Sequence, residues 1–131
     1  MSTAKPFPVL ATAAFCLVVA AAQPVLAAAA PPGVERVLGK MIEAVKAQSY
    51  EDFLAEADAQ FKSQFSRQQF EGICGMYTAP LRKGYRLEYL GQLRQRSAFV
   101  HLWKISVVDG QDESLIRLVL KDGKVSGVWV Q

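Results

Sequence analysis

The sequence is poor in the side chains that form disulfides and metal sites. Its 131 residues include two cysteines, Cys16 and Cys74, and a single histidine, His101. A structural zinc site needs four such ligands, so we expect no metal site. The sequence also has no Gly-rich phosphate loop and no nucleophile-elbow motif, and we therefore expect no cofactor.

A strong charge of one sign is also missing. Lys and Arg number 15 against 12 Asp and Glu, which gives a net charge of +3. The balance differs between the two halves: residues 28–79 carry five basic and seven acidic side chains, and residues 80–131 carry nine and five. The basic half could face an anionic partner, but a solvated surface is the simpler interpretation. A charge this modest argues against a nucleic-acid partner.

The longest apolar run stands at the N-terminus and is short for a membrane span. A positive charge precedes it, it extends from residue 9 to 22, and a proline and a small-residue segment follow. A spanning helix needs about 20 apolar residues, whereas this layout is typical of a secretory signal peptide. We predict a signal peptide over residues 1–27 with cleavage after Ala27, or alternatively after Ala29 or Ala30.

Cleavage would deliver an exported domain, in the bacterial periplasm or secreted, with no stable membrane anchor; an uncleaved anchor is the alternative. Cys16 is not expected to carry a lipid, because it follows a bulky phenylalanine in the middle of the apolar run. The remaining chain is predicted to comprise a flexible lead-in, residues 28–33, and one domain, residues 34–131. Its only cysteine, Cys74, lies on an apolar helix stripe and is expected to be buried and inert.

Three helices are expected in the first half of this domain. Residues 34–48 carry apolar side chains at the spacing of an amphipathic helix: Val34, Val37, Leu38, Met41, Ile42 and Val45. Ser49 can cap a second, shorter helix over about residues 50–57. Phe61 and Phe65 fall in a connection without a clear pattern.

The third helix has the clearest start signal. Ser66 and Gln69 match a capping box, and Pro80 is expected to end the helix. The two internal glycines, Gly72 and Gly75, each cost about 1 kcal/mol relative to Ala in a helix. Close backbone packing would explain them, and so would room for a ligand.

From Tyr85 onward the hydrophobic period changes to two, which predicts strands. Four strands are expected, antiparallel because each connection is short: 85–93, 98–108, 113–121 and 124–131. The Asp122-Gly123 pair favours a two-residue hairpin. It fixes a register in which the last two strands share an inward face: Ile116, Leu118, Leu120, Val125 and Trp129.

The second strand is expected to point alternate side chains toward the helices: Phe99, His101, Trp103, Ile105 and Val107. Its register follows from a turn at residues 109–112, which places Ile105 beside Ile116, Trp103 beside Leu118 and His101 beside Leu120.

The first strand has two plausible registers. A regular turn at residues 94–97 would point Arg86, Glu88 and Leu90 inward, whereas a bulge at Gly91 would point Tyr85, Leu87 and Tyr89 inward. We favour the bulge, because burying Arg and Glu is costly. In the regular register Glu88 and His101 would be neighbours, and they would form a candidate acid/base pair.

Helices packed on a curved antiparallel sheet form a two-layer α+β plan. The segments "AVKAQSYEDFLAEADAQFKSQFS" and "LVLKDGKVSGVWV" resemble the NTF2-like (cystatin-like) superfamily, and more narrowly small exported bacterial domains of the DUF3887 type, over about residues 34–131. The resemblance implies a cone formed by N-terminal helices and a four-stranded sheet. Known NTF2-like members include isomerases, dehydratases, ligand-binding modules and assembly domains, so this fold does not by itself set the function.

Three functional classes follow from this resemblance. The class we favour is a non-catalytic exported domain that binds a small apolar ligand or a protein partner in the cone, with four candidate binding residues: Tyr77, Tyr89, His101 and Trp103. The second is an isomerase- or hydrolase-like enzyme that uses Glu88 and His101. The third is an assembly domain that forms a homodimer through an outer sheet face: Leu115, Val119 and Val130.

Overall fold

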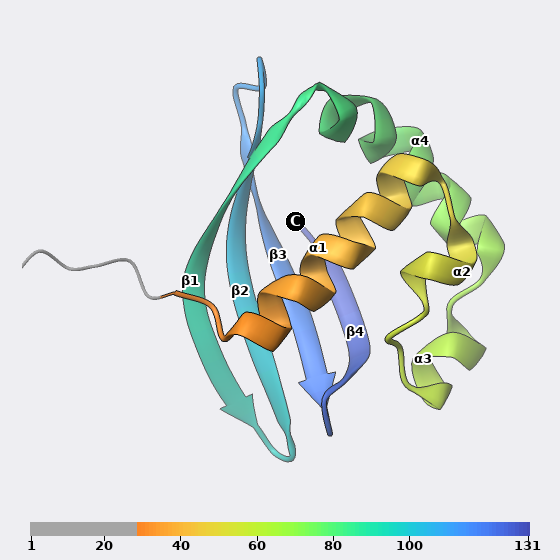
Figure 1. Cartoon of the computed structure of the whole chain (residues 1–131), viewed down its shortest axis with the longest axis vertical. Coiled ribbons are helices and arrows are strands. Elements are labelled where there is room, and N and C mark those ends of the chain that lie inside the picture. Colours follow the sequence, from red (N-terminus) through yellow and green to blue (C-terminus); the bar gives the residue numbers. More distant parts are fainter. Residues whose placement is uncertain (1–28) are drawn as a thin grey trace, which may run out of the picture.

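The computed structural model describes residues 29–131, so the predicted signal peptide and its favoured cleavage site lie outside the described residues. Four helices precede four strands in the chain: α1 (Pro32–Ala47), α2 (Tyr50–Phe53), α3 (Ala59–Gln64), α4 (Arg67–Lys83), β1 (Tyr85–Gln95), β2 (Ala98–Val107), β3 (Glu113–Lys121) and β4 (Lys124–Val130). The strands form one antiparallel sheet in the order β1-β2-β3-β4. The helices lie on one side of this curved sheet (Figure 1). The predicted α+β fold class is thus confirmed.

The first helix begins earlier than predicted. Pro32 and Gly33, expected in the flexible lead-in, are its first two residues. Proline is favoured at this position, since its fixed φ suits the helix and its missing N–H would have no partner there. The helix ends at Ala47, and the next residue, Gln48, adopts the left-handed conformation (φ 55°). None of the helices in the described residues is long and apolar enough to span a membrane.

The second helix is shorter than predicted. Ser49 caps it as expected, accepting a hydrogen bond from the Asp52 amide at 3.3 Å, but the helix ends at Phe53. The following backbone pairs instead with the edge of β4. There the Val125 N–H donates to the Glu56 carbonyl at 2.9 Å, and the Val125 carbonyl accepts from the Asp58 N–H at 2.8 Å. Tertiary pairing has therefore replaced the last turn of this helix.

The fourth helix starts as predicted and continues past its proline. The capping box of Ser66 and Gln69 is formed. The prediction that Pro80 ends the helix is wrong, because the next two residues make strong tertiary contacts. Leu81 is buried in the core, and Arg82 donates two hydrogen bonds, of 2.9 and 2.6 Å, to the Lys46 carbonyl at the end of α1.

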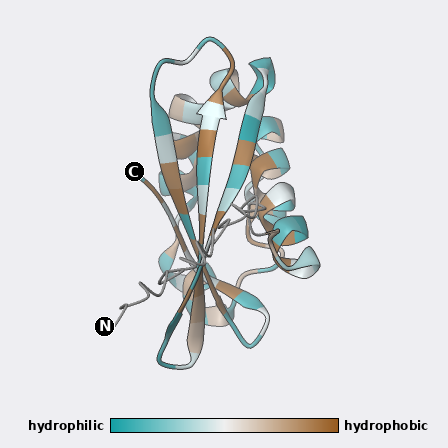
Figure 2. Ribbon diagram, turned by 90° about the vertical axis from the view of Figure 1, so that its left-hand side faces the viewer, coloured by the Kyte–Doolittle hydropathy of each residue, from teal (hydrophilic) through white to brown (hydrophobic). Residues whose placement is uncertain are grey.

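The first strand has the predicted bulge. The pairing shifts between Tyr89 and Gly91, and Gly91 has a φ of 143°, a conformation that favours glycine. Tyr85, Leu87 and Tyr89 therefore pack against the core, as predicted. Figure 2 shows the resulting bands of hydrophilic and hydrophobic residues along the strands.

The register between β2 and β3 differs from the prediction by two residues. Trp103 pairs with Ile116, His101 with Leu118 and Phe99 with Leu120, and Ile105 pairs with Ser114. The inward face is the one predicted, because a shift of two leaves each side chain on its own side of the sheet. The connection between the strands is correspondingly longer than the predicted four-residue turn.

The last strand reverses its faces part-way. Leu120 pairs with Val125 as predicted, but the pairing then shifts, so that Leu118 meets Val128 and Arg117 meets Trp129. The prediction that Trp129 points inward is therefore wrong: its side chain lies on the outer face and is 52% exposed. The Arg117 guanidinium lies 5.5 Å from the ring centre of Trp129, a cation–π arrangement. Val128 takes the inward position and packs against the core.

Candidate ligand-binding cavity

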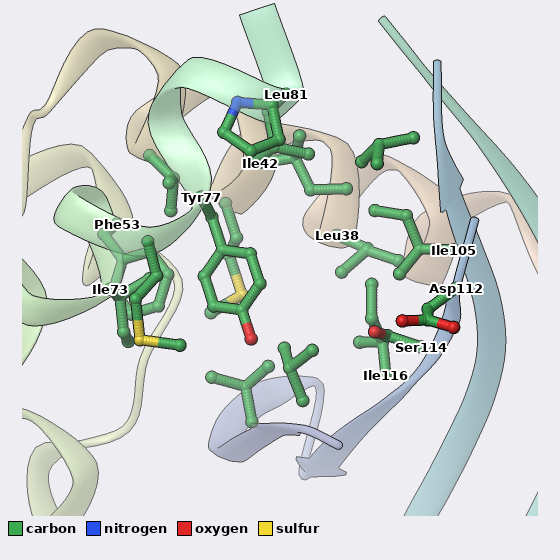
Figure 3. Close-up of a pocket in the computed structure, with 17 residues that line it drawn as sticks. Leu38, Ile42, Phe53, Ile73, Tyr77, Leu81, Ile105, Asp112, Ser114 and Ile116 are labelled. Atoms are coloured by element: carbon green, nitrogen blue, oxygen red, sulfur yellow. The ribbon is translucent and has the colours of Figure 1, made fainter. Parts of the chain in front are cut away.

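A cavity of about 420 Å³ lies between α1, α4 and the inner face of the sheet. Figure 3 shows its lining residues. Most of them are apolar: Leu38, Met41, Ile42, Val45, Phe53, Ile73, Met76, Tyr77, Pro80, Leu81, Ile105, Val107, Asp112, Ser114, Ile116, Val128 and Val130. This volume is within the usual range for small-molecule sites, which are concave and mostly apolar with a few polar groups.

One face of α4 forms a wall of the cavity. Ile73, Tyr77, Pro80 and Leu81 lie one turn apart along α4 and face the same side. This wall exists because the helix continues past Pro80. The amphipathic stripe of α1 supplies the wall beside it, with Leu38, Met41, Ile42 and Val45.

The sheet supplies the opposite wall. Ile105 and Val107 come from β2, Ser114 and Ile116 from β3, and Val128 and Val130 from β4. The reversal of faces in β4 is what brings Val128 and Val130 to this wall. Val130 was predicted on the outer face as part of a dimer surface, and that placement is wrong, because it pairs with Ile116 and lines the cavity.

The floor and the rim of the cavity differ in exposure. Leu38, Met41 and Ile116 are buried, with exposed fractions of 2%, 3% and 4%. Met76 and Val130, by contrast, are 64% and 40% exposed. A ligand could therefore enter past α4 and the end of β4 and meet a dry, apolar floor.

Three side chains give the cavity its polarity. They are the Tyr77 hydroxyl, the Ser114 hydroxyl and the Asp112 carboxylate. In Figure 3, Tyr77 extends from α4 into the cavity, and Asp112 and Ser114 lie together on the β3 side. Within residues 29–131 none of the three makes a side-chain hydrogen bond or a salt bridge to the protein. As far as residues 29–131 are concerned, all three groups are thus available to a ligand.

The other three residues predicted to bind a ligand do not line this cavity. Tyr89, His101 and Trp103 instead form a cluster in the sheet, with the Tyr89 and Trp103 rings edge to face at 5.1 Å between centres. The Tyr89 hydroxyl lies 3.0 Å from His101 Nδ1, within hydrogen-bond distance. His101 is 3% exposed and Trp103 1% exposed, so both belong to the core.

Burial alone explains the electrostatics of this cluster. It lowers the pKa of His101 from its ordinary value, because the charged imidazolium loses its hydration. It raises the pKa of the Tyr89 hydroxyl for the same reason. Both groups therefore stay neutral near pH 7, and their contact is a hydrogen bond between neutral groups.

The candidate catalytic pair is not formed. Glu88 lies on the outer face of the sheet, where its carboxylate accepts from Lys104 Nζ at 2.9 Å. His101 points to the inner face. The bulge at Gly91 separates them, since it turns Tyr89 inward and Glu88 outward.

Two of the three polar lining residues, Asp112 and Ser114, were not predicted from the sequence. Asp112 was assigned to a turn, and Ser114 was not considered as a site residue. The alternation of β3 did contain a signal, since Ser114 lies two residues before the inward-facing Ile116. The length of the β2–β3 connection, which brings Asp112 to the cavity, was not readable.

A second, smaller hollow lies between the end of α1 and the start of α4. It measures about 350 Å³ and is lined by Gln48, Arg67, Phe70, Glu71, Cys74 and Gly75. Cys74 is 8% exposed and its thiol faces the Val45 carbonyl at 3.8 Å, so the predicted burial is confirmed. In residues 29–131 no group of three or more His, Cys, Asp or Glu side chains is placed to hold a metal ion.

No protein-family model matches the chain, and no curated protein matches it. One similar solved structure is a Kribbella flavida DSM 17836 protein whose assignment as a ketosteroid isomerase is provisional, with 14% identity, a TM-score of 0.42 and 76% of each chain covered. Another is TerC co-crystallised with polyporic acid, with 13% identity, a TM-score of 0.45, and 77% of this chain and 91% of that chain covered. At these values the likeness carries no residue role to this chain.

Proposed function

We propose that this chain is an exported domain that binds a small, largely apolar ligand in the cavity between α1, α4 and the sheet, and does so without catalysing a reaction. The observation that supports this most is the cavity itself: about 420 Å³, walled by aliphatic side chains and open past exposed rim residues. A domain of this size normally fills its core, because each unfilled volume loses packing contacts.

The isoleucines provide a direct test of binding. All four isoleucines of the chain, Ile42, Ile73, Ile105 and Ile116, line the cavity. Their δ1 methyl groups can be labelled and followed by NMR while a neutral apolar probe is added. We would use 1-adamantanol as a compact probe and 1-decanol as an elongated one. At least one of them should shift the methyl signals saturably.

Blocking the cavity supplies the control. Ile73→Phe adds volume to the α4 wall and should abolish the shifts, whereas Leu93→Phe, at a side chain that is 50% exposed and outside the cavity, should leave them unchanged. Binding by neither probe up to its solubility limit would refute the proposal, provided that the methyl spectrum shows a folded protein.

Export, and membership of the NTF2-like superfamily with a DUF3887-type relationship, are part of the same proposal. Export is tested by expressing the full chain in a Gram-negative host and determining the N-terminus of the periplasmic product. A product that begins at Ala28 is expected. A full-length product retained in the membrane fraction would support the uncleaved anchor instead.

An enzyme remains the second candidate, now centred on different residues. Asp112 is a carboxylate at an apolar cavity with two hydroxyl groups, Tyr77 and Ser114, in the same lining. A positioned carboxylate can accept a proton from a bound substrate. Loss of turnover with retained binding in Asp112→Asn would favour this candidate over simple binding.

A further inference from the structure

The only formal charge in the cavity lining is negative. Of the seventeen lining residues, Asp112 alone carries a formal charge. It stands at the start of the sheet wall, two residues before Ser114. Any ligand that fills the apolar cavity and reaches this rim therefore meets a negative group.

Basic side chains are numerous in this half of the chain, but none of them lines the cavity. Lys104 lies on the outer face, within 2.9 Å of Glu88 and 3.5 Å of Glu113. Arg117 lies on the same outer face and stacks on Trp129. No Lys or Arg lines the cavity, and within residues 29–131 none forms a salt bridge with Asp112. In the described part of the chain this exposed carboxylate thus has no cationic partner.

We propose that the cavity selects compact apolar ligands that carry a protonated amine. The apolar body lies between α1 and α4, and the ammonium group lies at Asp112 and Ser114. This inference rests on the proposed binding function and names the ligand class for it. An ammonium has three donors and no acceptor, which matches the carboxylate and hydroxyl oxygens at this rim. A carboxylate ligand would meet Asp112 with like charge and be disfavoured.

Three probes with one apolar body test the choice of head group: 1-aminoadamantane, 1-adamantanol and 1-adamantanecarboxylate, at pH 7. Their Kd values are measured on the full chain, as purified after expression, from the isoleucine methyl shifts. Asp112 is exposed, so we expect the amine to bind about two- to fivefold more tightly than the alcohol, the range of a solvent-exposed ion pair. The carboxylate should bind most weakly, and raising the salt concentration should narrow the differences.

Two variants locate the effect. Asp112→Asn should bring the amine and the alcohol to equal affinity while the alcohol still binds. Asp109→Asn is the matched control: it removes a negative charge from the same connection at a residue outside the lining, and Asn tolerates the positive φ of 64° there. It should leave the order of the three probes unchanged.

The outcomes separate the two proposals. If the alcohol binds and the amine is no tighter, or if Asp112→Asn keeps the preference, the inference about the head group is wrong and the binding function stands. If none of the three probes shifts the isoleucine methyl signals, the cavity does not bind adamantane-sized ligands and the inference about the head group is refuted. The elongated 1-decanol probe then decides the binding function independently.

Discussion

The two glycines inside α4 allow a quantitative prediction about stability. A methyl group added at Gly72 or at Gly75 would meet no atom within 4 Å, so neither residue is required by close packing. Glycine in a helix interior is about 1 kcal/mol less favourable than alanine, chiefly because it loses more backbone freedom on folding. Gly72→Ala and Gly75→Ala should therefore each stabilise the domain by about 1 kcal/mol, and the double variant by about 2 kcal/mol.

The assay is urea unfolding followed by circular dichroism, with the thermal midpoint as a second measure. For a domain of this size, 1 kcal/mol corresponds to a Tm shift of about 4–8 °C. The control is Gly127→Ala, where the added methyl carbon would overlap the Trp129 ring. That substitution should destabilise the domain, because the ring must leave its place over the strand.

A loss of stability in Gly72→Ala or Gly75→Ala would refute the reasoning. It would mean that the surface around these glycines is packed in solution against something other than residues 29–131. A change in the slope of the unfolding curve, rather than its midpoint, would instead place the effect in the unfolded chain.

Two further predictions concern the buried side chain of His101 and the capping box of α4. Burial lowers the pKa of His101, so the unfolded chain binds more protons than the folded domain does. The contribution of the neutral His101 side chain to stability is therefore complete above about pH 6.5, the ordinary pKa of histidine. This contribution is lost as the pH falls through the folded-state pKa. Between pH 7.5 and 5 the free energy of unfolding should therefore fall less in His101→Gln than in the wild type. In the control Glu88→Gln it should fall as much as in the wild type. An equal fall in all three proteins would contradict the prediction. Ser66→Ala removes the capping-box hydroxyl and should cost about 1 kcal/mol in urea unfolding, whereas Ser63→Ala, at an exposed hydroxyl that caps no helix, should change stability far less.

Where several sequence signals agreed, the sequence predicted the structure well. The bulge at Gly91 followed from a comparison of two registers, one of which buried Arg86 and Glu88. The same reasoning removed Glu88 from the interior, and with it the catalytic pair. Hydrophobic alternation also assigned β2 its correct faces.

Where the outcome depended on tertiary contacts, the sequence was insufficient. A two-residue slip between β2 and β3 leaves the pattern of faces intact, so alternation could not detect it. Trp129 turned outward because Arg117 and the bare backbone of Gly127 offer its ring a surface on that side. The helix continued past Pro80 because Leu81 and Arg82 are held by the core and by α1.

The candidate site was predicted only in part, for a related reason. Four residues were expected to line a cavity, and one of them, Tyr77 on α4, does. Tyr89, His101 and Trp103 instead pack against one another in the core, with one hydrogen bond between Tyr89 and His101, and do not line the cavity. The position of a cavity depends on how the helices and the sheet pack together, so it cannot be predicted from the apolar pattern of any one element.

The backbone pairing of Glu56 and Asp58 with Val125 also covers part of a sheet edge. An unpaired edge strand is a template onto which another chain can add a strand. The segment after α2 covers part of the β4 edge, and the bulge at Gly91 interrupts the regular ladder of the opposite edge strand, β1. Substitutions that detach the segment after α2 from β4, or that remove the bulge in β1, should therefore cause aggregation before they reduce ligand binding.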